Sequence, residues 1–297
     1  MMKLRTIISA LWKIGAIWTA SWWLLGIFGL SYPPVLYWVS TLCLFIFLDM
    51  RVWLDIAQIF GNLYAKIAHA GKLSSDGTFE SNVNYILPFE GAWTVFNGGV
   101  GMELSHSWGI IPQRYAYDFI ITDDEGNSFT GDATQLASYY CYGKNIIAPA
   151  DGVVVKISNR QCDSRVTGTK VFCDAWDIRG NFIVIQHAEN EYSVLAHLIP
   201  GSIAVRKDDK VKQGQVIARC GNSGNTSEPH LHFQLQNGRS FFASAGLPVA
   251  FSGIAAQIKE NYTLADTRSV QTETRKAQNG ASVYIGRGLE VENGGNK

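Results

Sequence analysis

The chain has 297 residues, with 25 basic and 25 acidic side chains and a formal net charge of zero. The chain lacks the excess of basic residues that is typical of nucleic-acid-binding proteins. Its sequence contains no helix-turn-helix, zinc knuckle or phosphate-binding glycine loop. Hydrophobic residues make up 47% of the chain, and its length suffices for one sizeable domain with appended segments.

The first 50 residues predict an α-helical membrane anchor. Residues 7–30 form an almost continuous apolar run, and about 20 apolar residues suffice to span a bilayer. Pro33 and Pro34 end this helix, and a second, shorter apolar run covers residues 35–48. We expect the two runs to form a helical hairpin in the membrane, with a single span as the alternative.

The flanking charges leave the orientation of this anchor open. Lys3 and Arg5 precede the first run, and Arg51 follows the second. For a two-span hairpin, the positive-inside rule places both ends in the cytoplasm, whereas a single span with Lys3 and Arg5 inside places the remaining chain outside. Residues 51–71 mix apolar and charged side chains and predict an amphipathic helix on the membrane surface.

Residues 72–250 predict an all-β domain. Short strands bounded by glycine or Asp-Gly turns are expected at residues 153–157, 182–185 and 215–218. A helical period is almost absent, so the fold class is an antiparallel sandwich or partly open barrel, with a hairpin core like that of lipoyl domains. We expect residues 123–143 to be an insertion that rims the active-site groove.

The chemistry is concentrated in a few histidines and one aspartate. In an extended segment, His230 and His232 share a face because the side-chain period of a strand is two. Asp118 lies in an apolar setting, where an unpaired carboxylate is costly to bury. A catalytic zinc site needs three protein ligands and an open position. His106, Asp118 and His232 could supply the ligands, with His197 and His230 handling protons. The alternatives are a polar strand face for the histidine pair and a backbone-satisfied buried side chain for His197.

Several sequence blocks occur in the order found in a known family. They are Ala148-Pro-Ala-Asp-Gly-Val, Gly180-Asn, Ala196-His-Leu, Lys210-Val with Gly214, Gly221-Asn-Ser-Gly and Pro229-His-Leu-His-Phe. Over residues 90–245 the chain resembles the M23 family of zinc metallopeptidases, of the lysostaphin and LytM type. An ordered set of blocks is much stronger evidence than any one short motif.

The resemblance implies both the site and the reaction. It implies that His232 and Asp118 are zinc ligands, and that His197 and His230 orient water and stabilise the oxyanion. The expected function is a membrane-anchored zinc endopeptidase that hydrolyses peptide bonds in peptidoglycan stem peptides or cross-bridges. The expected partners are peptidoglycan and the lipid bilayer, without nucleic acid, and the catalytic domain is expected outside the cytoplasm.

The chain departs from the family pattern at Arg114, where a zinc-binding histidine is expected. A guanidinium group has no acceptor and cannot bind zinc. We therefore expect His106, eight residues earlier, to be the third ligand, and Arg114 to pair with an acidic neighbour. The alternative is that His106 is a surface residue in a metal-free module that recruits or activates another wall hydrolase. A lipoyl-like carrier domain is a third, weaker alternative.

The C-terminal region, residues 251–297, predicts a final helix at residues 253–264 and a polar tail. Within this tail, residues 281–286 could add a strand.

The remaining cysteines and histidines leave several alternatives open. Cys162 and Cys173 either form a disulfide or remain unpaired, since sequence alone does not fix cysteine pairing. Cys141 and Cys220 are expected to be buried thiols or a second pair. His187 is expected to be solvated, and His69 to lie near a helix end without a chemical role.

Overall fold

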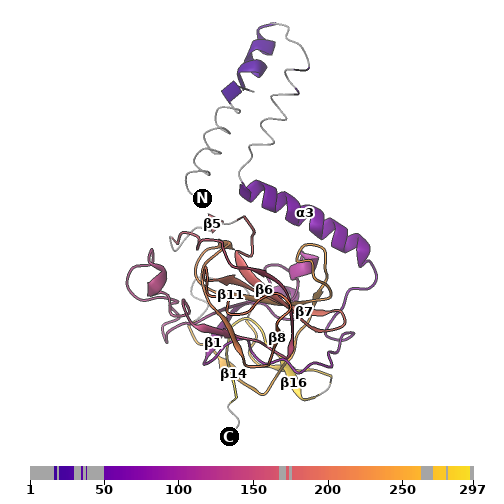
Figure 1. Cartoon of the computed structure of the whole chain (residues 1–297), viewed down its shortest axis with the longest axis vertical. Coiled ribbons are helices and arrows are strands. Elements are labelled where there is room, and N and C mark those ends of the chain that lie inside the picture. The colour runs from indigo at the N-terminus through magenta and orange to yellow at the C-terminus, as the bar shows by residue number, and fades with distance from the viewer. Residues whose placement is uncertain are drawn as a thin grey trace. The chain divides into compact units, whose positions relative to one another are not determined.

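The structure is a computed structural model of the chain (Figure 1). It describes residues 17–18, 20–29, 35, 38, 50–166, 172–173, 176–261, 270–278 and 280–294. The chain divides into two compact units, residues 1–59 and residues 60–297.

The predicted membrane hairpin falls mostly on residues outside the described ranges, including Lys3, Arg5, Pro33 and Pro34. In the part of the chain that is described, no helix is long and apolar enough to cross a bilayer. Helix α3 (Met50–Ala68) confirms the helix expected after the apolar runs.

Strands build the second unit (Figure 1). In chain order they are β1 (Trp93–Asn97), β2 (Tyr117–Ile120), β3 (Asn145–Ile147), β4 (Gly152–Ser158), β5 (Phe172–Cys173), β6 (Asn181–Ala188), β7 (Glu191–Leu198), β8 (Lys210–Val211), β9 (Val216–Arg219), β10 (Asn225–Thr226), β11 (Leu231–Gln236), β12 (Gly246–Leu247), β13 (Phe251–Ser252), β14 (Ile254–Ile258), β15 (Arg275–Lys276), β16 (Ser282–Tyr284) and β17 (Leu289–Asn293). Three short 3-10 helices, η1 (Met102–Leu104), η2 (Ile111–Gln113) and η3 (Leu136–Ser138), lie in the connections.

One large antiparallel sheet dominates this unit and confirms a mostly β domain. It has ten strands, in the order β14-β17-β1-β2-β11-β7-β6-β4-β8, with β12 paired to β11. Three smaller sheets pair β10 with β5, β3 with β9, and β13 with β16 and β15. The strands expected at residues 153–157, 182–185 and 215–218 fall within or overlap β4, β6 and β9.

Strand β11 shows how the sequence pattern positions chemistry on this sheet. Leu231, Phe233 and Leu235 alternate along it and join the main hydrophobic core. Side chains on a strand point alternately to opposite faces, so His232 lies on the other face, together with two buried glutamines. Both faces of β11 are buried, and its polar face must therefore be hydrogen-bonded.

The helix predicted at residues 253–264 is wrong for the described part of that segment. Residues 254–258 form strand β14, which pairs with β17 over five register positions. Ala, Gln and Ile favour a helix locally, but the backbone bonds offered by β17 decide the conformation, since tertiary context overrides helix propensity. Strand β16 (Ser282–Tyr284) lies within the segment expected to add a strand.

The cysteines with described side chains are reduced. Cys141 and Cys220 are free and buried, which selects the buried-thiol alternative over a second pair. Cys162 is free and exposed, so the alternative of a disulfide to Cys173 is wrong.

Candidate active site

The register of four neighbouring strands aligns the candidate residues across the sheet. Asn97 on β1 is opposite Asp118 on β2, and Asp118 is opposite His232 on β11. His232 is opposite Ala196 on β7, directly before His197. Residues far apart in the sequence therefore meet because antiparallel pairing fixes which residues stand opposite one another.

Asp118 is the centre of the cluster and is buried. His232 Nδ1 donates a hydrogen bond of 2.9 Å to Asp118 Oδ1. His230 Nε2 lies 3.7 Å from the same oxygen, and His106 Nε2 lies 4.0 Å from Asp118 Oδ2. Three of the four candidate imidazoles, those of His106, His230 and His232, therefore lie within 4.0 Å of this carboxylate.

His197 reaches the cluster from a distorted strand. Its φ angle is +64°, a left-handed conformation that is uncommon for residues other than glycine. The pairing of β6 with β7 shifts register at this point, and such a bulge re-aims a side chain. The centre of the His197 ring lies 4.5 Å from that of His230 and 5.8 Å from that of His232.

A close approach between two turns fixes the His197 ring. Its Nδ1 donates to the Ser223 carbonyl at 2.7 Å. Ser223 lies against Gly180, where an added Cβ would be 2.2 Å from the Ser223 carbonyl carbon. Gly180 also has a φ angle of +63°, so both space and conformation require glycine there.

The His230 ring is fixed in a similar way. Its Nδ1 donates to the Glu228 carbonyl at 2.8 Å. Both His197 and His230 therefore carry their proton on Nδ1, and their Nε2 is the basic nitrogen of the neutral ring. The insertion expected at residues 123–143 contacts this segment: Ser128 Oγ donates to the Glu228 carboxylate, and the Cys141 thiol donates to the Pro229 carbonyl.

Gln234 orients the remaining nitrogen of His232. His232 Nε2 donates to Gln234 Oε1 at 3.0 Å. The amide orientation is defined because Gln234 Nε2 donates to the backbone carbonyl of Pro112 and to the side-chain oxygen Oε1 of Gln236. Gln234 was not predicted from the sequence; its place two residues after His232 on the same strand face is the signal that could have revealed it.

The loop that carries His106 is anchored on both sides. Arg114 was expected to pair with an acidic neighbour, but no such ion pair occurs among the described residues. Its Nε instead donates to the Trp108 carbonyl at 3.2 Å, and its guanidinium lies over the Trp108 ring. Asn62 in α3 donates to the Gly109 carbonyl and accepts from Ile111 N–H. Arg114 thus holds the His106 loop through a carbonyl and an aromatic ring, the planar contacts for which guanidinium is suited.

The charges of the cluster depend on one another. Burial would raise the pKa of the Asp118 carboxyl, but the hydrogen bond from His232 and the three nearby imidazoles hold this pKa well below its usual range. Burial would lower the pKa of His232, but the bond to Asp118 raises it. Burial, reinforced by His230 and His232, lowers the pKa of His197 well below its usual value. Asp118 is therefore ionised, and His197 is a neutral ring.

The donor set fits a zinc ion. Among the described residues, no group of three or more His, Cys, Asp or Glu side chains is already arranged as a metal cage; His232 and Asp118 instead hydrogen-bond to each other. Two imidazoles and one carboxylate are nevertheless a ligand set typical of catalytic zinc. The bond from His232 Nε2 to Gln234 leaves Nδ1 as the atom directed to the ligand cluster, as second-shell partners do in metal sites.

The two other histidines lie outside the cluster. His69 follows α3 directly and its Nε2 contacts the Ala243 carbonyl. His187 was expected to be solvated, and this is wrong: its ring is half-buried and bonds to the Asp151 carbonyl and the Ser193 hydroxyl. Burial lowers the pKa of His187 to about 4.

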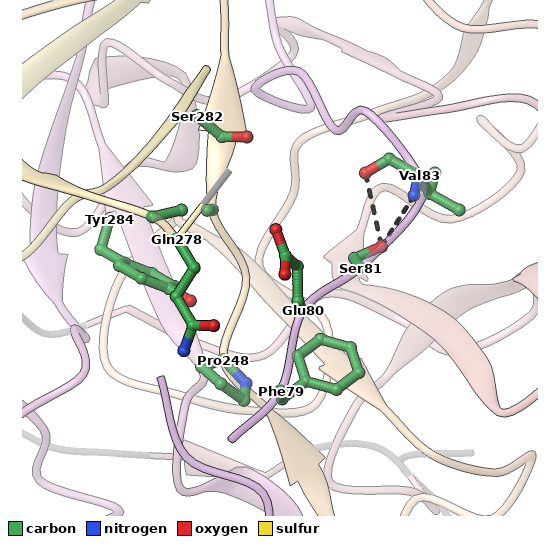
Figure 2. A pocket seen from close by; sticks show the side chains of 10 residues that line it. Phe79, Glu80, Ser81, Val83, Pro248, Gln278, Ser282 and Tyr284 are labelled. Atoms are coloured by element: carbon green, nitrogen blue, oxygen red, sulfur yellow. Dashed lines mark hydrogen bonds between the residues drawn. The ribbon is translucent and has the colours of Figure 1, made fainter. Parts of the chain in front are cut away.

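A small pocket elsewhere in the domain does not involve these histidines. Figure 2 shows it between Phe79, Pro248 and Tyr284, with Ser81 bonded to the backbone of Val83 beside it. Its volume of about 20 Å³ is sufficient for roughly one water molecule. This pocket is too small to hold a peptide.

The fold and the cluster together define a mostly β domain with a histidine–carboxylate site suited to hydrolytic metal chemistry. Residues 135–243 match the sequence profile of Peptidase family M23, the family that the ordered sequence blocks resemble. The matched segment includes His197, His230 and His232, whereas His106 and Asp118 precede it.

The relatives that are similar to this segment include proteins named as peptidoglycan endopeptidases and proteins named as murein hydrolase activators. Peptidoglycan DD-endopeptidase ShyA of Vibrio cholerae is 34% identical over 112 residues, which cover 37% of this chain and 22% of the relative. Murein hydrolase activator NlpD of Escherichia coli is 36% identical over 94 residues, which cover 32% of this chain and 20% of the relative. The chain thus spans about a fifth of the length of these relatives.

The similarity to solved structures has low TM-scores. The catalytic domain of lysostaphin from Staphylococcus simulans is 20% identical, with 58% of this chain and 90% of that chain covered and a TM-score of 0.29. A score this low supports no inference about this chain.

Proposed function

We propose that this protein is a membrane-anchored, zinc-dependent endopeptidase that hydrolyses peptide bonds in peptidoglycan. The main observation in support is that His106, His230 and His232 all approach one buried carboxylate, Asp118. The match of residues 135–243 to Peptidase family M23 and the similarity to a relative named as a peptidoglycan endopeptidase support the reaction class and the substrate.

His106, Asp118 and His232 would hold the zinc ion. When bound, zinc supplies Lewis-acid activation of a water molecule and of the scissile carbonyl. In the proposed site, Asp118 contributes the negative charge, and Gln234 keeps a proton on His232 Nε2, so that Nδ1 is the nitrogen that would lose its proton and act as a ligand.

His197 and His230 would handle the protons. Each has its Nδ1 proton committed to a backbone carbonyl, so Nε2 is the nitrogen that accepts a proton from water or donates one to the leaving amine. The two ring centres are 4.5 Å apart, so both imidazoles can serve one reacting group. A protonated ring there would also stabilise the developing oxyanion.

Attachment to a membrane rests on the sequence and on α3. The exposed side chains of α3 include Phe60, Leu63, Tyr64 and Ile67, whose exposed fractions are 66%, 52%, 59% and 70%. These apolar side chains recur at helical spacing, as in helices that lie in the membrane interface. Since α3 follows the apolar residues 7–48 directly, the bilayer is the proposed partner of this face.

A catalytically inactive module that activates another wall hydrolase is the second candidate. The observation that favours it is the similarity to relatives named as murein hydrolase activators, together with Arg114 in place of the expected histidine ligand. The complete set formed by His106, Asp118 and His232 favours the peptidase.

The test is digestion of purified peptidoglycan by the full chain in detergent, with mass spectrometry of the released fragments. We expect new amine termini, lost after treatment with a chelator and in the His232→Ala protein, and retained in the His69→Ala protein as the matched control. Zinc binding without new termini, combined with stimulation of a separate wall hydrolase, would replace the peptidase with the activator.

A further inference from the structure

Asn97 is a buried polar residue between two of the proposed metal ligands. It ends strand β1, and its side chain is almost completely inaccessible, with 1% of the residue surface exposed. The pairing of β1 with β2 shifts register between Val95 and Asn97. A bulge of this kind re-aims the side chain that follows it, and here it brings Asn97 opposite Asp118.

The two ends of the Asn97 amide contact different ligand residues. Oδ1 accepts a hydrogen bond of 2.9 Å from the backbone N–H of His106. Nδ2 donates a hydrogen bond of 3.2 Å to Asp118 Oδ2. The orientation of the amide is unambiguous because the N–H of His106 requires an acceptor and the carboxylate requires a donor.

The oxygen that Asn97 contacts is the one that faces His106. Asp118 Oδ1 accepts the hydrogen bond from His232 and lies 3.7 Å from His230 Nε2, whereas Oδ2 lies 4.0 Å from His106 Nε2. Asn97 therefore fixes the rotation of the carboxylate and the backbone position of His106 with one side chain. His106 needs such support because its side chain is 54% exposed and lies in a loop.

The residues between Asn97 and His106 form a tight loop whose two ends lie close together. Gly98 N–H donates to the Leu104 carbonyl at 3.1 Å. Gly98 and Gly99 have φ angles of +118° and +147°, which only glycine adopts readily. An added Cβ at Gly98 would lie 2.5 Å from the Ala116 carbonyl oxygen. The loop thus closes tightly next to Asn97.

We propose that Asn97 is a positioning residue for metal binding: it joins the His106 loop to the Asp118 carboxylate and compensates for the ligand position lost to Arg114. This rests on the proposed zinc site. Outer-shell partners of metal ligands commonly contribute about 10- to 100-fold to metal affinity. Asn97 differs from other such partners in this site because it acts on two ligands at once.

The test compares zinc and cobalt affinity of the full chain with that of Asn97→Ala and Asn97→Leu. Leucine fills a similar volume without hydrogen bonds, so it separates packing from positioning. Thr94→Val is the matched control, since it removes a buried hydrogen bond, to Thr122, from the same strand. Visible absorption of the cobalt form reports the ligand set, and thermal unfolding with chelator reports the fold.

We expect both Asn97 variants to bind metal about 10- to 100-fold more weakly, with an altered cobalt spectrum and metal-free unfolding close to that of Thr94→Val. In a His106→Ala background, Asn97→Ala should cost less affinity than in the wild type, because the two residues act on one ligand. Wild-type affinity in the Asn97 variants, or their failure to fold without metal, would overturn the positioning role alone. A wild-type chain that binds no zinc would overturn the proposed function as well.

Discussion

The hydrogen bonds that each ring nitrogen makes distinguish the histidines of the proposed site from one another. His197 and His230 both donate from Nδ1 to backbone carbonyls, whereas His232 donates from Nε2 to Gln234 and directs Nδ1 to Asp118. The hydrogen bond made by one ring nitrogen decides whether the other carries a proton, so these bonds fit the proposed proton-handling and ligand roles. The sequence predicted the residue types; the tautomers require the folded backbone.

His187 provides a prediction about pH that is independent of the site. An unfolded chain protonates this residue near pH 6.5, but the folded chain does so only near pH 4. The unfolded state binds more protons between these values, so the contribution of the neutral ring is complete above pH 6.5 and is lost as the pH falls towards 4. We expect this contribution to be on the order of 2 kcal/mol for a half-buried ring.

Urea unfolding of the wild type and of His187→Gln between pH 7.5 and pH 4 measures this effect. The difference in unfolding free energy between the two proteins should change across that range, because only the wild type titrates at this position. A constant difference would show that the His187 ring is not protonated more readily in the unfolded chain.

At the scale of elements, the proposed active site depends on two turns that contact each other. The turn before β6 places Gly180 against Ser223, and Ser223 holds His197. The start of β6 therefore determines where a histidine on β7 points. Gly180 and the segment 221–224 both belong to the ordered sequence blocks, but the contact between them was not predicted from the sequence.

Replacement of Gly180 by alanine tests this contact. Gly180→Ala adds left-handed strain and a clash with the Ser223 carbonyl, and we expect a loss of stability of about 3 kcal/mol and of peptidase activity of at least about tenfold. Gly201→Ala is the matched control: its φ angle is +77° but no atom lies within 4 Å of an added Cβ, so strain alone should cost about 1 kcal/mol. Equal effects of the two substitutions would exclude a special role for the Ser223 contact.

Where elements depend on distant partners, the sequence was a poor guide. The segment 253–258 has helix-forming residues, yet it forms β14 because β17, more than thirty residues later, pairs with it. Asn97 was missed for the same reason, since its contacts are set by register across β1 and β2. Local motifs revealed the alternating strand at His230 and His232, whose side chains serve one carboxylate.

For the molecule as a whole, the expected topology can be tested with Cys162. This thiol is free and exposed, whereas Cys141 and Cys220 are buried. In a chain with Cys43→Ser and Cys173→Ser, a membrane-impermeant maleimide should label Cys162 in intact spheroplasts, because the proposed substrate is outside the cytoplasm. Labelling only after lysis would place the domain in the cytoplasm and remove peptidoglycan as the substrate.

The same protein should sediment with membranes and resist extraction by alkaline carbonate, because an apolar run of residues 7–30 is long enough to span a bilayer. Release by carbonate would restrict membrane association to a surface contact such as that proposed for α3.

The zinc content of the purified full chain tests the central claim most directly. We expect about one zinc ion per chain in the wild type and in His69→Ala, and almost none in His232→Ala, Asp118→Ala and His106→Ala at the same zinc concentration. Full zinc occupancy in His106→Ala would contradict the proposal that this histidine replaces the ligand lost at Arg114. No zinc in the wild type would contradict the metallopeptidase itself.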